Sequence, residues 1–248
     1  MNHIKLSDID TRAPKHLDKK ETKDKLRKLL EDLDEQQNLL YAESKHSILV
    51  VIQGMDASGK DGLTKHVFGS MNPQGVVVKS YKAPTPEELS HDFLWRIHQH
   101  SPAKGMIQIF NRSHYEDVLV TRVHGWCDNE TAKLRMRAIN DFERLLHVHG
   151  NTKILKFYLH ISPEEQQIRL DERMQNPAKM WKYNEKDFEE AKFWDQYQNY
   201  YEEMFKHTSE IPWNIIPSDQ NWYKEYLVAD KLHETMKDLK MQFPGIKK

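Results

Sequence analysis

The sequence is poor in cysteine, has no long apolar run and has no excess of one charge. Cys127 is the only cysteine among 248 residues, so no disulfide can form within the chain, and this fits a reducing cytoplasm. The longest apolar run, residues 48–52, is far too short to cross a bilayer. The first ten residues lack the apolar stretch of a signal peptide. We therefore expect a cytoplasmic protein with no membrane partner.

The charges of the chain almost cancel. It holds 37 Lys and Arg against 38 Asp and Glu, which gives a formal net charge of −1 at pH 7. General coating of nucleic acid needs an excess of positive charge, so we expect no nucleic-acid partner. Any site for a polyanion must come from a local concentration of cations. The length and the 38% hydrophobic content suit a single α/β domain over residues 1–248 with a full core.

The most informative stretch is ILVVIQGMDASGKDG, residues 48–62. An apolar, β-branched run leads into a loop with the G-x-x-x-x-G-K spacing of a phosphate-binding loop, from Gly54 to Lys60. Backbone N–H groups in such a loop form a nest for an anion, and the helix that follows adds the positive end of its dipole. Lys60 supplies a mobile cation for a transferred group. The alternative is a glycine-rich turn between a strand and a helix that binds no ligand.

Two carboxylates accompany this loop. Asp56 lies inside it, and Asp61 stands where a Ser or Thr usually follows the lysine. Carboxylates beside a phosphate nest repel the anion unless a divalent cation lies between them. We therefore interpret Asp56 first, and Asp61 second, as candidates to hold Mg²⁺, with Mn²⁺ as the alternative ion.

The hydrophobic pattern predicts strands that alternate with helices along the chain. We expect strands at 48–52, 76–80, 105–110, 153–160 and 213–216, and helices at 19–44, 60–70, 87–99, 131–149, 163–174, 186–206 and 222–241. This alternation predicts an α/β fold, a five-stranded parallel sheet with helices on both faces. Residues 1–17 are expected to lie as a polar arm on the surface, and the aromatic residues of 188–205 to form core and subunit contacts rather than a nucleobase platform.

A second polar cluster, FNRSHYED at 110–117, follows the third expected strand. The carboxyl ends of neighbouring parallel strands open on one crevice, so this cluster should lie beside the phosphate loop. Arg112 can contact phosphate oxygens in a bidentate manner, and Glu116 and Asp117 can complete a metal shell with Asp56. The alternative is an ordinary helix N-terminus with acidic residues in its first turn.

Four stretches, in the same order, resemble the polyphosphate kinase 2 family. They are GMDASGKDG (54–62), KAPTPEELSHDFLWRIH (82–98), GMIQIFNRSHYEDVLVTRVH (105–124) and RMQNPAKMWKYNEKDF (173–188), and the resemblance covers about 48–201. It implies a three-layer P-loop kinase-like fold, Mg²⁺, and reversible transfer of the terminal phosphoryl group of inorganic polyphosphate to a nucleotide. The sequence after the third strand is closer to the branch that accepts both AMP and ADP. Adenine and guanine nucleotides are therefore the expected partners, in a homo-oligomer that is a dimer or a tetramer.

By the same resemblance, residues 173–187 are similar to a helical lid that closes on the phosphates and excludes water. Arg169 lies one helical turn before Arg173 and is expected to share its face. Asn111 stands where many P-loop enzymes carry an acidic residue, so no direct metal contact is expected from it. The expected catalytic residues are Asp56, Lys60, Arg112 and Arg173, and the expected phosphate- and nucleotide-binding residues are Gly54, Met55, Ala57, Ser58, Gly59, Lys60, Asp61, Asn111, Arg112, Arg122, Lys179 and Lys182.

Two other functions remain compatible with these motifs. An ATP-dependent nucleoside or nucleotide kinase would use the same loop, and the choice of phosphoryl donor would distinguish it. A non-catalytic nucleotide-sensing protein would bind a nucleotide without turnover, but it has little need of carboxylates placed to bind a metal ion or of a basic lid.

Overall fold

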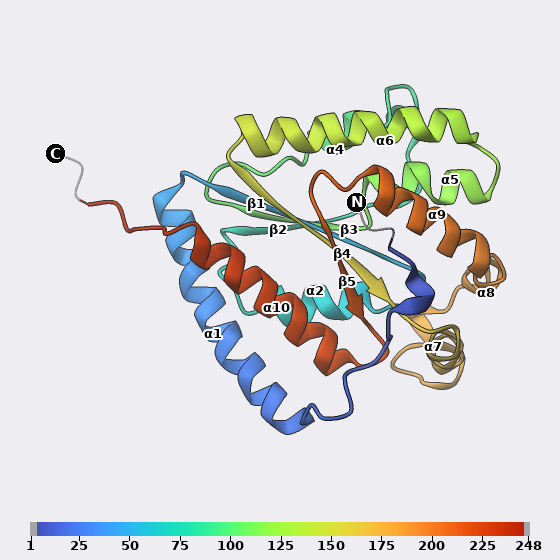
Figure 1. Ribbon diagram of the computed structural model, residues 1–248, viewed down its shortest axis with the longest axis horizontal. Coiled ribbons are helices and arrows are strands. Elements are labelled where there is room, and N and C mark those ends of the chain that lie inside the picture. The colour runs from blue at the N-terminus through green and yellow to red at the C-terminus, as the bar shows by residue number, and fades with distance from the viewer. Residues whose placement is uncertain (1–3, 246–248) are drawn as a thin grey trace.

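The computed structural model describes residues 4–245, which form a central parallel sheet between two layers of helices (Figure 1). The strands are β1 (Ser47–Gly54), β2 (Val76–Ser80), β3 (Ile107–Asn111), β4 (Thr152–His160) and β5 (Trp213–Pro217). All neighbouring pairs are parallel, in the order β2-β3-β1-β4-β5. The predicted five-stranded α/β fold is confirmed, and the strand that carries the phosphate loop lies at the centre of the sheet.

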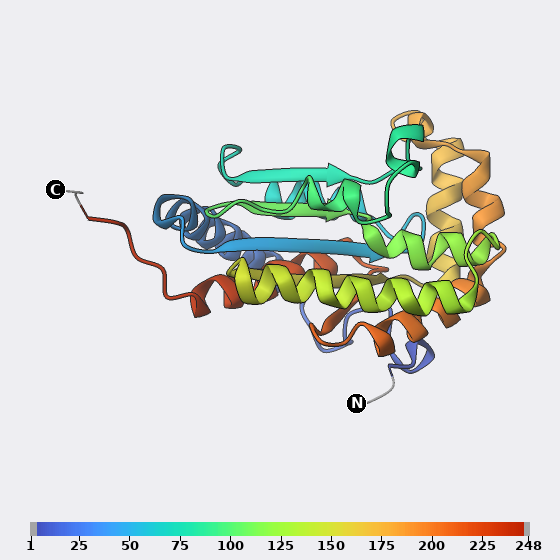
Figure 2. The ribbon, with the colours of Figure 1, turned by 90° about the horizontal axis from the view of Figure 1, so that it is seen from above.

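Helices cover both faces of this sheet. The longer ones are α1 (Lys19–Glu43), α2 (Lys60–Phe68), α6 (Asn129–Arg144), α7 (Pro163–Gln175), α9 (Trp194–His207) and α10 (Asn221–Asp238), and the short ones are α3 (Pro86–Leu89), α4 (Trp95–His98), α5 (Val120–Val123) and α8 (Glu185–Ala191). Helices α1, α2 and α10 lie on one face and α6 and α9 on the other, while α7 and α8 lie beyond the carboxyl ends of the strands (Figures 1 and 2). Between residues 4 and 245, no helix is both long and apolar enough to span a membrane.

The apolar run of β1 serves both core layers. Ile48, Val50 and Ile52 belong to the cluster under α1, α2 and α10, whereas Leu49 and Val51 belong to the cluster under α6 and α9. Successive side chains of a strand point to opposite faces, so a strand covered on both sides must be apolar throughout. This burial explains why the strand before the phosphate loop reads as an uninterrupted hydrophobic segment.

Two predicted helices are wrong because each is broken in the middle. The expected helix 87–99 becomes α3 and α4, since the Asp92 carboxylate accepts from the N–H of Leu94 (2.9 Å) and makes a local turn between them. The expected helix 186–206 becomes α8 and α9. There the N–H groups of Lys192 and Phe193 bond three residues back, to Glu189 and Glu190, which tightens the chain and ends α8.

The amino-terminal arm is tied to the molecule. Leu6 is buried, and its N–H donates to Glu202 of α9 (2.7 Å). Thr11 donates to Asp219, in the loop between β5 and α10 (2.8 Å). The arm therefore contacts elements beside the carboxyl edge of the sheet. The first three residues of the predicted arm, and the last three of the predicted 1–248 domain, lie outside the described residues; the division into a 1–46 segment, the body and a 173–187 lid stays a prediction.

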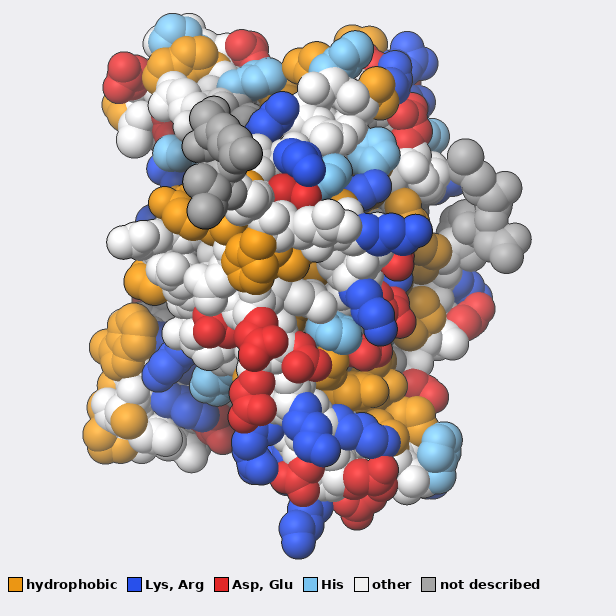
Figure 3. Space-filling view, turned by 90° about the vertical axis from the view of Figure 1, so that its left-hand side faces the viewer, with side chains coloured by type: hydrophobic (Ala, Val, Ile, Leu, Met, Phe, Trp, Pro, Cys, Tyr) orange, Lys and Arg blue, Asp and Glu red, His pale blue; other side chains and the backbone are white. Residues whose placement is uncertain are grey.

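The face at the amino ends of the strands carries acidic, basic and hydrophobic side chains side by side (Figure 3). Interspersed charges of both signs make a weak field for an extended polyanion. The phosphate loop, which follows Gly54, lies at the other end of the sheet, where the strands finish.

Candidate active site

The phosphate loop turns sharply between β1 and α2. Gly59 has φ of 94°, and a Cβ there would lie 2.3 Å from the Nζ of Lys224. A Cβ on Gly54 would lie 2.8 Å from Ser58 Oγ and 2.9 Å from the carbonyl of Leu159. Packing against the backbone of Leu159 excludes a side chain at Gly54, and the left-handed φ of Gly59 favours glycine, so both glycines of the motif are required by the conformation of the loop.

Lys60 lies across this loop and is 8% exposed. Its Nζ donates to the carbonyls of Gly54 (2.7 Å) and Met55 (3.1 Å). Burial, together with the nearby charge of Arg112, lowers the pKa of Lys60 to about 8. The predicted mobile cation is thus present at the loop, bonded to the loop's own carbonyls.

Arg112 joins the end of β3 to the loop, as the sequence predicted. Its backbone is left-handed, with φ of 62°, and its Nη2 donates to Asp56 Oδ1 (2.5 Å) while Nη1 lies 3.9 Å from Glu116 Oε2. Burial alone would raise the pKa of Asp56, but Arg112 and Lys60 outweigh it and lower that pKa below its ordinary value. Asp56 is therefore an anion at neutral pH, flanked by two cations.

The two acidic residues after β3 have different surroundings. Glu116 faces Arg112 and Lys60, and its burial raises its pKa. Asp117 has its carboxylate 3.4 Å from the Nη2 of Arg96, away from the contacts of the loop, and burial raises its pKa too. Of the predicted pair, only Glu116 contacts a residue that also contacts Asp56.

These carboxylates fit a divalent cation that is shared with a phosphate. Within residues 4–245 no group of three or more His, Cys, Asp and Glu side chains could hold a metal ion by itself. Mg²⁺ in phosphoryl-transfer sites is held by one or two carboxylates, with substrate phosphates and water completing the shell. Asp56, whose side chain is 20% exposed, and Glu116, 18% exposed, suit that arrangement.

Asp61 and Asn111 are bonded to each other. Asn111 Nδ2 donates to Asp61 Oδ1 (2.8 Å), and Asp61 also lies 3.5 Å from the Nζ of Lys182. Burial acts to raise the pKa of Asp61, but the bond from Asn111 and the charge of Lys182 lower it below its ordinary value. The first helical turn after the loop is thereby linked both to β3 and to the predicted lid.

Two of the three predicted cations of the segment 173–187 interact electrostatically with carboxylates in or just after the loop. Arg173 forms an ion pair with Asp187 of α8, and its charge helps to lower the pKa of Asp56. Lys182 reaches Asp61. Lys179 is instead paired with Glu172 on α7.

Arg122 is not brought to the loop. It is 6% exposed, its Nη2 donates to Glu203 (2.6 Å) and Asn129 (2.8 Å), and its guanidinium lies 3.9 Å from the centre of the Tyr200 ring. These contacts join α5 to α6 and α9. In this arrangement Arg122 packs helices together, and its predicted phosphate contact has no geometric support.

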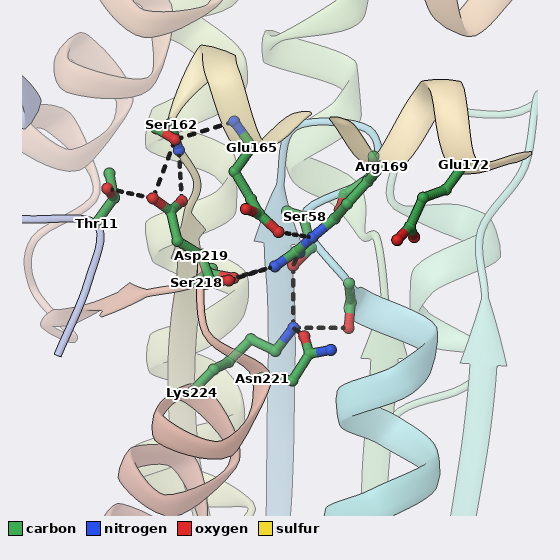
Figure 4. A network of polar contacts seen from close by, with 12 residues as sticks. Thr11, Ser58, Ser162, Glu165, Arg169, Glu172, Ser218, Asp219, Asn221 and Lys224 are labelled. Atoms are coloured by element: carbon green, nitrogen blue, oxygen red, sulfur yellow. Dashed lines mark hydrogen bonds and ion pairs between the residues drawn. The ribbon is translucent and has the colours of Figure 1, made fainter. Parts of the chain in front are cut away.

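Three residues hold the outer side of the loop: Gln166 and Lys224, which the sequence did not point to, and Arg169, which was assigned to the face of Arg173 (Figure 4 shows Arg169 and Lys224). Gln166 donates to the carbonyl of Asp56 (3.0 Å), Arg169 to those of Ala57 (3.1 Å) and Ser58 (3.2 Å), and Lys224 to those of Ser58 (3.1 Å) and Gly59 (3.4 Å). Arg169 was expected beside Arg173 in the lid, but it holds the loop backbone instead.

One signal for Lys224 was present in the sequence. Lys224 precedes Val228 and Leu232 at four-residue intervals, so it lies on the face of α10 that those residues bury. A lysine at a core position of an amphipathic helix must find buried acceptors. Periodicity could therefore have marked Lys224 as a functional candidate, although not its partners.

Comparison with known proteins identifies the family of this chain. The family model described as Polyphosphate kinase 2 (PPK2) matches residues 16–244. An AMP/ADP-polyphosphate phosphotransferase of Meiothermus ruber is 50% identical over 214 residues, 86% of this chain and 80% of that protein. An ADP-polyphosphate phosphotransferase of Rhodopseudomonas palustris is 41% identical over 233 residues, 88% of this chain and 80% of that protein.

The fold is likewise that of a solved structure. The crystal structure of polyphosphate kinase 2 from Arthrobacter aurescens TC1 superposes with a TM-score of 0.95 at 40% sequence identity, over 99% of this chain and 89% of that one. The three-layer P-loop kinase-like fold expected from the motifs is confirmed. By sequence, by fold and by the loop at its centre, the chain belongs to the polyphosphate kinase 2 family.

Proposed function

We propose that this chain is a polyphosphate-dependent nucleotide kinase. It transfers the terminal phosphoryl group of inorganic polyphosphate to nucleoside mono- and diphosphates, AMP to ADP and ADP to ATP, and the reaction is reversible. The observation that carries the proposal is the loop with Lys60, joined through Asp56 and Arg112 to the end of β3 and flanked by Arg173 of the lid. The 50% identity to an AMP/ADP-polyphosphate phosphotransferase supports this donor and these acceptors.

The reaction brings two anions together, and the residues of the site suit that task. The P–O bond between the terminal phosphorus of the polyphosphate and its bridging oxygen breaks, a new P–O bond forms to a terminal phosphate oxygen of the nucleotide, and the polyphosphate shortened by one unit leaves with the former bridging oxygen as its new ionised end. That acceptor oxygen is already ionised at neutral pH, so no residue has to remove a proton. The requirement is in-line positioning and neutralisation of charge, which Lys60, Arg112 and Arg173 provide.

A divalent cation fits the same site. Asp56 and Glu116 would hold Mg²⁺ or Mn²⁺, which supplies further neutralisation of phosphate charge when bound. The lid then excludes water, so that the phosphoryl group passes to the nucleotide and not to water.

The experiment is an assay of the purified chain with Mg²⁺, polyphosphate and each of AMP, ADP, GMP and GDP, with the products separated by chromatography. We expect ADP and ATP from the adenine acceptors and no product from Lys60→Ala. Activity with ATP as the donor to nucleosides, and none with polyphosphate, would favour an ATP-dependent kinase. Nucleotide binding without any turnover would favour a sensing protein.

Three wider expectations belong to the same proposal: a cytoplasmic location, a homo-oligomer (dimer or tetramer), and no nucleic-acid or membrane partner. The buried, unpaired thiol of Cys127 and the balanced charge of the chain support the first and the last. Light scattering of the purified protein measures the oligomeric state directly.

A further inference from the structure

The phosphate loop is held from behind by side chains of two helices. Gln166 and Arg169 come from α7 and Lys224 from α10, and together they take the carbonyls of Asp56, Ala57, Ser58 and Gly59. In a trans peptide the carbonyl and the following N–H point in opposite directions. Carbonyls fixed toward α7 and α10 therefore turn the N–H groups that follow them toward the other side of the loop, where a phosphate would lie. The N–H of Ser58 is the exception, because it donates to the carbonyl of Met55 (3.2 Å).

Arg169 is itself firmly placed. Its Nε donates to Glu165 (2.8 Å), and its Nη2 donates to the carbonyls of Ser218 (2.8 Å) and Asp219 (2.9 Å). The guanidinium thus ties the loop to the segment between β5 and α10, as Figure 4 shows. Lys224 is 1% exposed and has a third acceptor, Asn221 Oδ1 (3.0 Å).

Fold stability alone does not account for a cation at Lys224. Burial, with the adjacent charge of Arg169, lowers the pKa of Lys224 to about 7, so the folded protein holds this ammonium at a cost. An apolar side chain of similar length could fill the space without that penalty. A bound anion on the other side of the loop would offset it.

We propose that Arg169 and Lys224 are positioning residues of the phosphate loop. They fix its peptide groups with the N–H side toward the bound phosphate, and they place positive charge behind the loop. Neither residue touches the substrate; both act through the backbone between Ala57 and Gly59. The inference rests on the proposed function, because it assigns these residues to the same phosphoryl-transfer site.

The test compares Lys224→Met and Arg169→Met with two matched controls. Lys231→Met removes an exposed lysine of the same helix α10, and Gln167→Met changes an exposed position of the same helix α7. For each protein, kcat and KM for polyphosphate are measured, binding of inorganic tripolyphosphate is titrated by calorimetry, and the thermal midpoint is recorded.

We expect Lys224→Met and Arg169→Met to lower kcat by at least about tenfold, as loss of preorganised donors does, and to weaken tripolyphosphate binding. The thermal midpoint of Lys224→Met should change little, because relief from a buried charge offsets the loss of its hydrogen bonds to Ser58, Gly59 and Asn221. A merely structural residue would lower stability and activity together. Arg169→Lys keeps the positive charge but has fewer N–H donors, so it should recover part of kcat. If Arg169→Met fails to fold, Arg169→Lys takes its place in the test. Lys224→Gln takes the place of Lys224→Met in the same way.

Wild-type kcat and tripolyphosphate affinity in both Met variants would overturn the proposal. So would losses that match the fraction of unfolded protein. These outcomes are distinct from failure of the proposed function, which would appear as a wild-type protein that binds tripolyphosphate but transfers nothing to any nucleotide.

Discussion

At the phosphate loop, an acidic and a neutral polar residue stand at swapped positions compared with many P-loop enzymes. In those enzymes a hydroxyl follows the loop lysine and an acid lies on a nearby strand end. Here Asp61 follows Lys60 and Asn111 ends β3, and the two side chains are hydrogen-bonded (2.8 Å). One carboxylate and one neutral polar group thus remain at the contact. The two departures looked independent in the sequence, because only the pairing of β1 with β3 brings them together.

The residue-scale prediction concerns the metal. Asp56→Asn should lower kcat and raise the Mg²⁺ concentration needed for half-maximal rate, because it removes the carboxylate that lies between Lys60 and Arg112. A Mg²⁺ titration of the initial rate at fixed polyphosphate and ADP measures this.

Asp117→Asn is the matched control, since Asp117 is paired with Arg96. Its Mg²⁺ titration should resemble that of the wild type. If instead Asp117→Asn shifts the titration and Asp56→Asn does not, the metal assignment moves to the other carboxylate.

At the scale of elements, hydrophobic periodicity predicted the strands better than the helices. All five strands are present: β1, β3, β4 and β5 are buried or half-buried, and the edge strand β2 was predicted from its β-branched run although Val77 and Val78 are exposed. The helices 87–99 and 186–206 were each predicted as continuous. The first is interrupted by a turn at Asp92 and the second by a hydrogen bond from Phe193 to the carbonyl three residues back, and neither break disturbs the apolar spacing much. Such breaks depend on local hydrogen bonds that periodicity does not record.

The element-scale prediction concerns the lid. Arg173 lies in the last turn of α7, just before the chain leaves the helix at Asn176, and it is paired with Asp187 of α8. If Arg173 neutralises charge mainly in the transition state, Arg173→Ala should cut kcat strongly, by about a hundredfold or more, with a modest change in polyphosphate affinity. Steady-state kinetics beside direct binding of polyphosphate separates the two effects.

The lid lysines provide the comparison. Lys182→Ala should raise the apparent KM for polyphosphate, because Lys182 lies beside the loop at Asp61, and the increase should be largest at low salt, where its charge is least screened. Lys179→Ala should raise it less, since Lys179 is paired with Glu172 on α7. An Arg173→Ala enzyme that turns over like the wild type would remove the lid arginine from the mechanism.

For the whole molecule, the sequence predicted the part of the site at the ends of β1 and β3 and missed the residues of α7 and α10 that hold the loop. The residues predicted to bind the phosphates belong largely to continuous motifs at the ends of β1 and β3, where a parallel sheet must place them together. The residues that hold the loop, Gln166, Arg169 and Lys224, come from α7 and α10, far along the chain. Their role depends on the packing of helices around the sheet, and charge or spacing alone does not specify that packing.

The same packing buries an ion pair beneath the site. Lys156 of β4 is fully buried and donates to Glu143 of α6 (2.8 Å), to Tyr115 Oη (3.0 Å) and to the carbonyl of Thr208 (2.7 Å). Tyr115 also donates to Glu143 (2.6 Å). The cluster joins the sheet, α6, the end of α9 and the turn that follows Arg112.

Removing one partner should therefore destabilise the whole fold. Lys156→Met leaves Glu143 buried without the ammonium group of Lys156, beside His114 Nε2 at 3.5 Å, which should lower the free energy of unfolding by about 3–5 kcal/mol at neutral pH. In that variant the pKa of Glu143 would rise above its unfolded value, so the loss should be smallest in acid, where Glu143 is protonated, and should grow as the pH increases through the folded-state pKa. The double variant Lys156→Met/Glu143→Leu removes both charges and should recover most of the stability. Urea unfolding of the three proteins, followed by circular dichroism at pH 5 and pH 8, measures these differences. A double variant no more stable than Lys156→Met would mean that packing around Lys156, and not the unpaired carboxylate, sets the cost.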